Sequence, residues 1–294
     1  MAHSRIHIAR ADILAYFDKH QQKIFKLTDL QGILSSQRNF WRLAQSTTTV
    51  KFISYLIEHA KMREINFPLP HRRETRFTWG EIPLIEVVLS LKPNAYFSHY
   101  TAMRLHGLTE QVPKVIYLNH EQHLKSQTTG GLVQGRIDMA FKSQPRLSNN
   151  VTQVDEVGIC LINGKNTGML GVISDSMQYD SEVPVNVRVT NLERTLIDIV
   201  TRPVYAGGVF EVLKAFELAK SQVSVNALGA MLAKIQHTYP YHQAIGFYME
   251  RAGYKPRAID LMRKFPMEFD FYLANAMGQM EYIKEWKLFV PKGF

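Results

Sequence analysis

The chain has 294 residues, of which 46% are hydrophobic and 21% charged, as in an ordinary globular protein long enough for two domains. No stretch approaches the roughly 18 to 20 consecutive apolar residues that span a bilayer, and the first residues lack the apolar region of a signal peptide. Cys160 is the single cysteine, so neither an internal disulfide nor a cysteine-based metal site is expected. These features predict a cytoplasmic protein with no membrane partner.

Positive charge is concentrated near the N-terminus. Residues 1–80 carry 13 Lys/Arg and 6 Asp/Glu, a net charge of +7, whereas the remaining 214 residues carry 22 and 20, a net charge of +2. A basic segment joined to a nearly neutral one indicates that one domain binds a polyanion and the other does not. Charge alone does not identify the polyanion. The secondary structure predicted for the basic segment is needed to say which polyanion it binds.

Apolar residues at helical spacing predict a first helix that ends near His20. A short strand is expected within 23–27, and a second helix with an apolar stripe begins at Thr28. A polar run, 44–49, leads into a third helix over 50–62. The expected core face of this third helix comprises Val50, Ile53, Leu56, Ile57 and Ala60.

Two β-prone runs, 64–69 and 75–79, flank a compact basic loop at 70–74. Helix, strand, helix, helix and hairpin is the order of a winged helix-turn-helix, whose third helix reads base edges with its leading residues. We expect three hairpin arginines to contact phosphate or the minor groove: Arg72, Arg73 and Arg76. The residues expected to face the bases are Thr47, Thr48, Thr49, Lys51 and Ser54. Two alternatives stay open, namely hairpin arginines that are merely solvated and threonines that only cap the helix.

Residues 81–294 predict a larger mixed α+β domain, which follows the winged helix-turn-helix of residues 1–80. A helix is expected at 82–93, a second one within 96–108 with Ser98 as its N-cap and Gly107 as its end, and a strand at 114–119. Short β-prone runs follow at 131–141, 157–166, 169–174 and 183–189, with a hairpin turn at 163–166. The later pattern predicts helices at 192–203, 207–220, 224–236 and 242–254, and strands at 269–274 and 282–291.

This larger domain carries no recognisable catalytic motif: it lacks a P-loop, a zinc-protease motif and a nucleophile elbow. His99, His106, His120 and His123 cluster in sequence and are interpreted as hydrogen-bonded or solvated side chains. Arg194 and Asp198, four residues apart on a predicted helix, are interpreted as a surface ion pair. We therefore expect no catalytic residue, no metal and no cofactor, and the protein is not expected to be an enzyme.

Three segments together carry a family resemblance. They are Tyr96-Phe97-Ser98-His99 with Ala102 and 106–108, then VTNLERTLIDIVTRPVYAGG at 189–208, and IGFYMERAGY at 245–254. The chain resembles the AbiEi antitoxins, transcriptional regulators of abortive-infection toxin–antitoxin operons, over most of its length. The segment at 189–208 is the most specific part of this resemblance.

The resemblance implies an autorepressor whose N-terminal domain binds inverted repeats of double-stranded DNA in its own promoter. Its C-terminal antitoxin-type domain would counteract a nucleotidyltransferase-like toxin in phage defence, without a stable complex between the two proteins. Inverted repeats imply two copies per operator, as a homodimer formed before or on DNA. The alternatives are a stand-alone regulator of defence genes, an enzyme that modifies the toxin or a nucleotide, and a scaffold protein.

Overall fold

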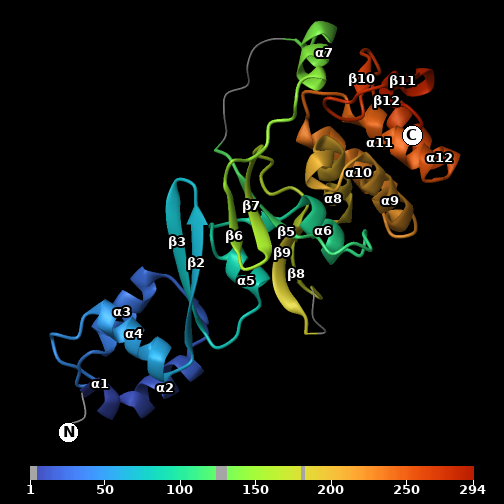
Figure 1. The fold of residues 1–294 in the computed structure, drawn as a ribbon. Coiled ribbons are helices and arrows are strands. Elements are labelled where there is room, and N and C mark those ends of the chain that lie inside the picture. The colour runs from blue at the N-terminus through green and yellow to red at the C-terminus, as the bar shows by residue number, and fades with distance from the viewer. Residues whose placement is uncertain (1–4, 124–130, 180–182) are drawn as a thin grey trace. The chain divides into compact units, whose positions relative to one another are not determined.

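The computed structural model describes residues 5–123, 131–179 and 183–294 (Figure 1). Packing divides the chain into two compact units. The first unit comprises Met1–Leu91 and Asn150–Val157, and the second comprises Lys92–Asn149 and Gly158–Phe294. This division lies beyond the expected boundary between residues 80 and 81, because the helix that follows the basic segment and a later strand belong to the first unit. Helices and strands mix in both units, so the fold is α+β, as predicted.

The first unit begins with helices and continues into a hairpin. Its helices are α1 (Arg5–Ile8), α2 (Arg10–Lys19), α3 (Leu27–Gln37), α4 (Thr49–His59) and α5 (Leu84–Leu89). Its strands are β1 (Ile24–Phe25), β2 (Met62–Leu69), β3 (Arg72–Trp79) and β6 (Val151–Val154). β1, β3 and β2 form an antiparallel sheet in that order, and β6 packs against β2. In Figure 1 the hairpin of β2 and β3 extends away from α2, α3 and α4.

Aromatic side chains from separate elements build the core of the first unit. Phe17 on α2 stacks on Trp79 at the end of β3, with ring centroids 4.8 Å apart. Trp79 Nε1 also donates to Asp18 Oδ1 at 2.7 Å, and this hydrogen bond, with a second from Lys61, lowers the pKa of Asp18. Phe52 of α4 is fully buried in the same core. These contacts fix the orientation of α4 relative to α2 and the sheet.

The second unit is built on a mixed sheet whose strands run in the order β7-β5-β4-β9-β8. These strands are β4 (Tyr96–Phe97), β5 (Val115–Glu121), β7 (Val157–Gly164), β8 (Val172–Met177) and β9 (Val185–Thr190). β5 is parallel to β7 and β4 is parallel to β9, whereas the β4–β5 and β8–β9 pairs are antiparallel.

Helices carry most of the core of the second unit. They are α6 (His99–Leu105), α7 (Gln134–Lys142), α8 (Leu192–Thr201), α9 (Val209–Ala219), α10 (Val225–Ile235), α11 (Tyr241–Arg251) and α12 (Pro256–Arg263). α11 contacts α8, α9 and α12. Gly246 of α11 lies against Trp286, where an added Cβ would come within 2.2 Å of the indole ring, so only glycine fits. A small sheet of β10 (Phe271–Tyr272), β12 (Leu288–Pro291) and β11 (Met280–Ile283) closes the unit.

Three expectations for the larger domain were wrong. The run at 131–141, read as β-prone, contains helix α7, because Ile137 and Phe141 lie four residues apart and are both buried. The turn at 163–166 does not form a hairpin, because β7 pairs with β5 and β8 pairs with β9 at the other edge of the sheet. The expected strand at 282–291 is divided between β11 and β12. Long-range strand pairing decided the second case, and local pattern does not encode it.

Candidate nucleic-acid interface

The N-terminal turn of α4 is exposed and well ordered by capping. Thr48 is the N-cap residue, and its hydroxyl accepts a hydrogen bond from the backbone N–H of Lys51 at 3.3 Å. Thr48 and Lys51 are exposed, while Thr47 and Thr49 are half-buried. The first turn contains no acidic side chain, so the positive end of the helix dipole is not neutralised there. This turn can therefore approach an anionic polymer without electrostatic penalty.

The face of α4 opposite the core is open to solvent. Its buried side chains are Phe52, Ile53 and Leu56. Ser54 is exposed, as expected for a residue that faces the bases. Val50 and Ile57, expected in the core, are 70% and 37% exposed, so this part of the expected core face was wrong. The buried stripe starts at Phe52 because that ring, not Val50, reaches Trp41, with which it stacks at 5.7 Å.

Arg38 holds the loop that precedes α4. From the sequence, this residue was considered only as part of the positive charge of residues 1–80. Its Nη1 donates to the carbonyl of Ala44 at 2.6 Å, and its Nη2 donates to the carbonyl of Thr47 at 3.1 Å. Two bonds from one planar group fix the direction in which the chain enters α4. Arg38 is thus a positioning residue for Thr47 and Thr48. No local sequence signal marks it, because its partners lie six and nine residues further along the chain.

The hairpin carries two exposed arginines near its turn. β2 and β3 are joined by Pro70 and His71 alone, so Arg72 and Arg73 begin a strand instead of occupying the longer loop expected from the sequence. Arg72 Nε lies 3.0 Å from Glu74 Oε1, with 43% of the arginine side chain exposed. Within the described part of the chain Arg73 has no acidic partner. Arg73 in particular retains its full charge for an external anion.

Arg76 does not fit the predicted role of a phosphate contact. Its side chain is only 2% exposed and lies 3.0 Å from Glu74 Oε2. Its guanidinium also donates to Ser90 Oγ and to the carbonyl of Ser90, both at 3.1 Å. We therefore correct the assignment: Arg76 is a structural residue that joins β3 to the end of α5. The prediction grouped Arg76 with Arg72 and Arg73 as hairpin arginines, but β3 is buried from Arg76 to Trp79 and exposed only at its start.

The second unit contains a buried ionic network. Arg194 Nε donates to Asp198 Oδ1 at 2.8 Å, and the two side chains are 5% and 11% exposed, which corrects their interpretation as a surface pair. Arg194 Nη1 also donates to Thr167 Oγ1 at 2.9 Å, and the backbone N–H of Thr167 donates to Glu121 Oε2 at 2.9 Å. Tyr96 hydroxyl donates to the other oxygen of Glu121 at 3.2 Å. This network links β5, the segment before β8 and α8.

Two histidines lie near the Arg194–Asp198 pair: His99 is buried and His237 is half-buried. Ser98 Oγ and His99 Nδ1 are 2.8 Å apart, and burial lowers the pKa of His99 to about 4. Burial likewise lowers the pKa of His237 to about 4, and its Nε2 has no hydrogen-bond partner among the described residues. Both rings are therefore neutral near pH 7. Among the described residues no group of His, Cys, Asp and Glu side chains has the arrangement of a metal site.

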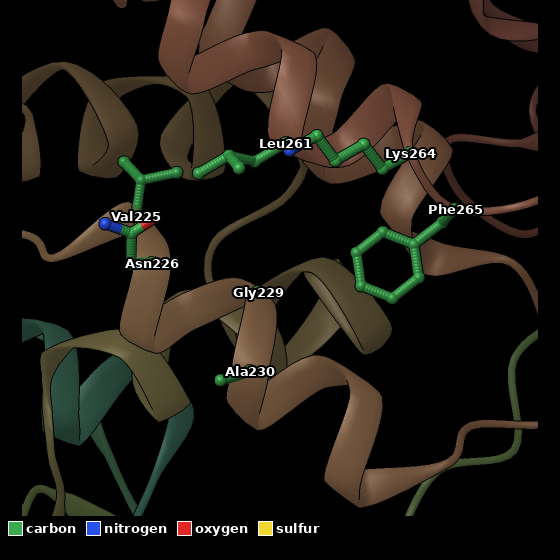
Figure 2. Close-up of a pocket in the computed structure, with 7 residues that line it drawn as sticks. All are labelled: Val225, Asn226, Gly229, Ala230, Leu261, Lys264 and Phe265. Atoms are coloured by element: carbon green, nitrogen blue, oxygen red, sulfur yellow. The ribbon is translucent and has the colours of Figure 1, made fainter.

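A shallow pocket of about 330 Å³ lies between α10 and α12 (Figure 2). Val225, Gly229 and Ala230 line it from α10, and Leu261 from α12, with the Phe265 ring turned into the space between the helices. Asn226 and Lys264 are its polar lining residues. These two polar side chains, with no buried charged group beside them, do not indicate which class of ligand the pocket would bind.

In the described part of the chain, no helix is long and apolar enough to cross a membrane.

Comparison with known proteins shows a similarity to a solved structure. No family model and no curated protein matches the chain. The chain is similar to the crystal structure of the RV2827C protein from Mycobacterium tuberculosis, with 14% identity and a TM-score of 0.60. The similarity covers 98% of this chain and 93% of that protein. At this identity the match extends to the fold alone.

Proposed function

We propose that the protein is a double-stranded DNA-binding transcriptional autorepressor whose first unit is a winged helix-turn-helix. The observation that carries the proposal is the exposed N-terminal turn of α4, held by Arg38 and Thr48, in a unit that also places Arg72 and Arg73 on a hairpin. The order of α2, β1, α3, α4, β2 and β3 matches that of winged DNA-binding domains, whose corresponding helix enters the major groove. The net charge of +7 in residues 1–80 supplies affinity for phosphate.

DNA contacts divide into two kinds under this proposal. Arg73 and Arg72 contact the phosphate backbone and contribute salt-dependent affinity that is independent of sequence. Lys51 and Ser54 lie on the open face of α4, where side chains reach base edges, and Thr48 lies at the start of the helix. Arg42 adds a further exposed cation that has no acidic partner among the described residues.

The proposal of DNA binding is tested by a gel shift of the full-length protein with the promoter region of its own gene. We expect a shifted band at lower protein concentration than with a shuffled duplex of equal length and composition. Equal affinity for both duplexes would contradict sequence-specific repression, and absence of any shift would contradict DNA binding. Stoichiometry in the same experiment reports whether two copies occupy inverted repeats.

We further propose that the second unit provides antitoxin activity against a nucleotidyltransferase-like toxin. The support is the resemblance of 96–108, 189–208 and 245–254 to AbiEi antitoxins, together with the near-neutral charge of residues 81–294. The proposal assigns no catalysis, cofactor or stable toxin complex to the chain. The stand-alone regulator remains the alternative if no toxin gene neighbours this one.

The antitoxin proposal is tested by co-expression with a neighbouring nucleotidyltransferase-like toxin gene. Wild-type protein is expected to restore growth. A full-length variant with Lys51→Ala, Arg72→Ala and Arg73→Ala is expected to restore growth equally while no longer repressing a promoter–reporter fusion. Failure of the wild type to restore growth would contradict the antitoxin proposal and leave DNA binding standing. ATP turnover by the purified protein would instead favour an enzyme that modifies the toxin or a nucleotide.

A further inference from the structure

Val50 is an apolar side chain that α4 presents to solvent on its first turn. It is 70% exposed, although valine in a helix is most often buried against a core. Ser54 and Ile57 follow it by four and seven residues, so the three side chains form one stripe along the helix. All three are exposed, and α4 is therefore open along its whole length on this face.

The exposure of Val50 is not a consequence of poor packing. The core face of α4 is complete without it, because Phe52 and Leu56 are fully buried and Ile53 is 6% exposed. A single exposed apolar residue is common on protein surfaces. Val50 differs from such a residue in its surroundings, since it lies beside the exposed Lys51 on a helix turn with no acidic side chain. Glu58 is the first acidic residue on α4, two turns further along.

This combination of one branched apolar side chain, a cation and a hydroxyl matches the chemistry of the DNA major groove. Base edges there present hydrogen-bond donors and acceptors, and thymine adds the C5-methyl, the one apolar group of an unmodified duplex groove. A hydroxyl such as that of Ser54 pairs with either donors or acceptors. Val50 can make no hydrogen bond with a base edge, so its favourable contact is with a methyl group.

We propose that Val50 selects thymine within the binding site by packing against its C5-methyl group in the major groove. The inference rests on the proposed function and adds to it a residue that determines specificity. Burial of one methyl group predicts about a fourfold gain in affinity at that base. Arg72 and Arg73 then contribute affinity for phosphate, whereas Val50 contributes choice of base.

The experiment selects duplexes from a random 20-base-pair library with the full-length protein and replaces each thymine of the best duplex by deoxyuridine, which lacks only the methyl group. Fluorescence anisotropy gives the dissociation constant for each replacement. We expect one position, or one per half-site in a repeated sequence, to lose about fourfold in affinity. The Val50→Ala variant is expected to bind the thymine and deoxyuridine duplexes equally at that position.

Leu27→Ala is the matched control, because Leu27 is 52% exposed on a different helix of the same unit. This variant is expected to keep the fourfold methyl effect. Val50→Thr, which retains the branch and one methyl, is expected to give an intermediate effect. The assignment of Val50 would be overturned if Val50→Ala still lost affinity on replacement of thymine by deoxyuridine, or if no such replacement changed the affinity of the wild type. Either result would leave DNA binding intact. If the library yields no enriched duplex, the proposed sequence-specific function falls as well.

Discussion

Arg76 on β3 donates from Nη2 to the backbone carbonyl of Ser90, 3.1 Å away, at the end of α5. The same nitrogen reaches the carbonyl of Leu91 at 3.4 Å, and Nη1 pairs with Glu74. Leu91 is the last residue of the first segment of the first unit. One buried guanidinium therefore fixes the point at which the chain leaves this unit. Because Glu74 also pairs with Arg72 through its other oxygen, the carboxylate joins an exposed arginine to a buried one.

Replacing Arg76 by alanine is expected to destabilise the protein by about 2 to 3 kcal/mol, because the carbonyls of Ser90 and Leu91 lose their donor in a buried position. Arg73→Ala, on the same strand but exposed, is expected to change stability by less than about 0.5 kcal/mol. Urea denaturation followed by tryptophan fluorescence compares the two variants. Equal stability of Arg76→Ala and Arg73→Ala would show that Arg76 is not a structural residue.

Replacing Arg72 and Arg73 together by alanine is expected to weaken binding to every duplex by a similar factor. The slope of log affinity against log salt concentration is expected to become shallower by about two, one per lost phosphate contact. Lys255→Ala with Arg257→Ala is the control, since it removes the same charge from exposed positions of the second unit. If both double variants change the salt slope equally, the hairpin does not contact the phosphate backbone.

Arg194→Met is expected to destabilise the protein by about 3 to 5 kcal/mol, because Asp198 then remains buried without its partner. Adding Asp198→Leu is expected to recover most of this loss, since a buried ion pair replaced by apolar residues of similar size costs little. The double-mutant cycle is measured by chemical denaturation. A double variant no more stable than Arg194→Met would indicate that Glu121 or Thr167, and not Asp198, is the partner that matters.

Acidification from pH 6.5 to pH 4 is expected to destabilise the second unit. Burial lowers the folded-state pKa of His99, His237 and His242 to about 4 each, from an ordinary value of 6.5, so the unfolded chain binds more protons in this range. Stability contributed by the neutral rings is complete above pH 6.5 and is lost as the pH falls towards 4. Each histidine contributes at most about 1.4 kcal/mol per pH unit.

Thermal unfolding between pH 4 and 7 measures this dependence. His237→Asn is expected to flatten the dependence, because it removes one of the groups whose pKa is lowered on folding. The exposed His123→Asn is expected to leave it unchanged. A pH dependence that is identical in the wild type and in His237→Asn would contradict the role of this ring.

The sequence by itself determined where most helices and strands of this protein lie, and it placed the excess charge. Spacing predicted the helix that became α2 and the helix that became α8, at whose start the Asn191 side chain accepts from the backbone of Arg194. These features are local, because each depends on residues within one or two turns of each other. The expectation that Lys51 and Ser54 are exposed on α4 also followed from local periodicity.

Only the tertiary structure decided which helix faces and which charged side chains are exposed to solvent. Val50 was expected in the core and is exposed, because Phe52 fills the space against Trp41. Arg76 and Arg194 were expected at the surface and are buried, because partners 14 and 27 residues away along the chain, Ser90 and Thr167, supply their hydrogen bonds. Periodicity fixes the angle between side chains on one helix or strand, but the burial of a side chain depends on which distant parts of the chain pack against it.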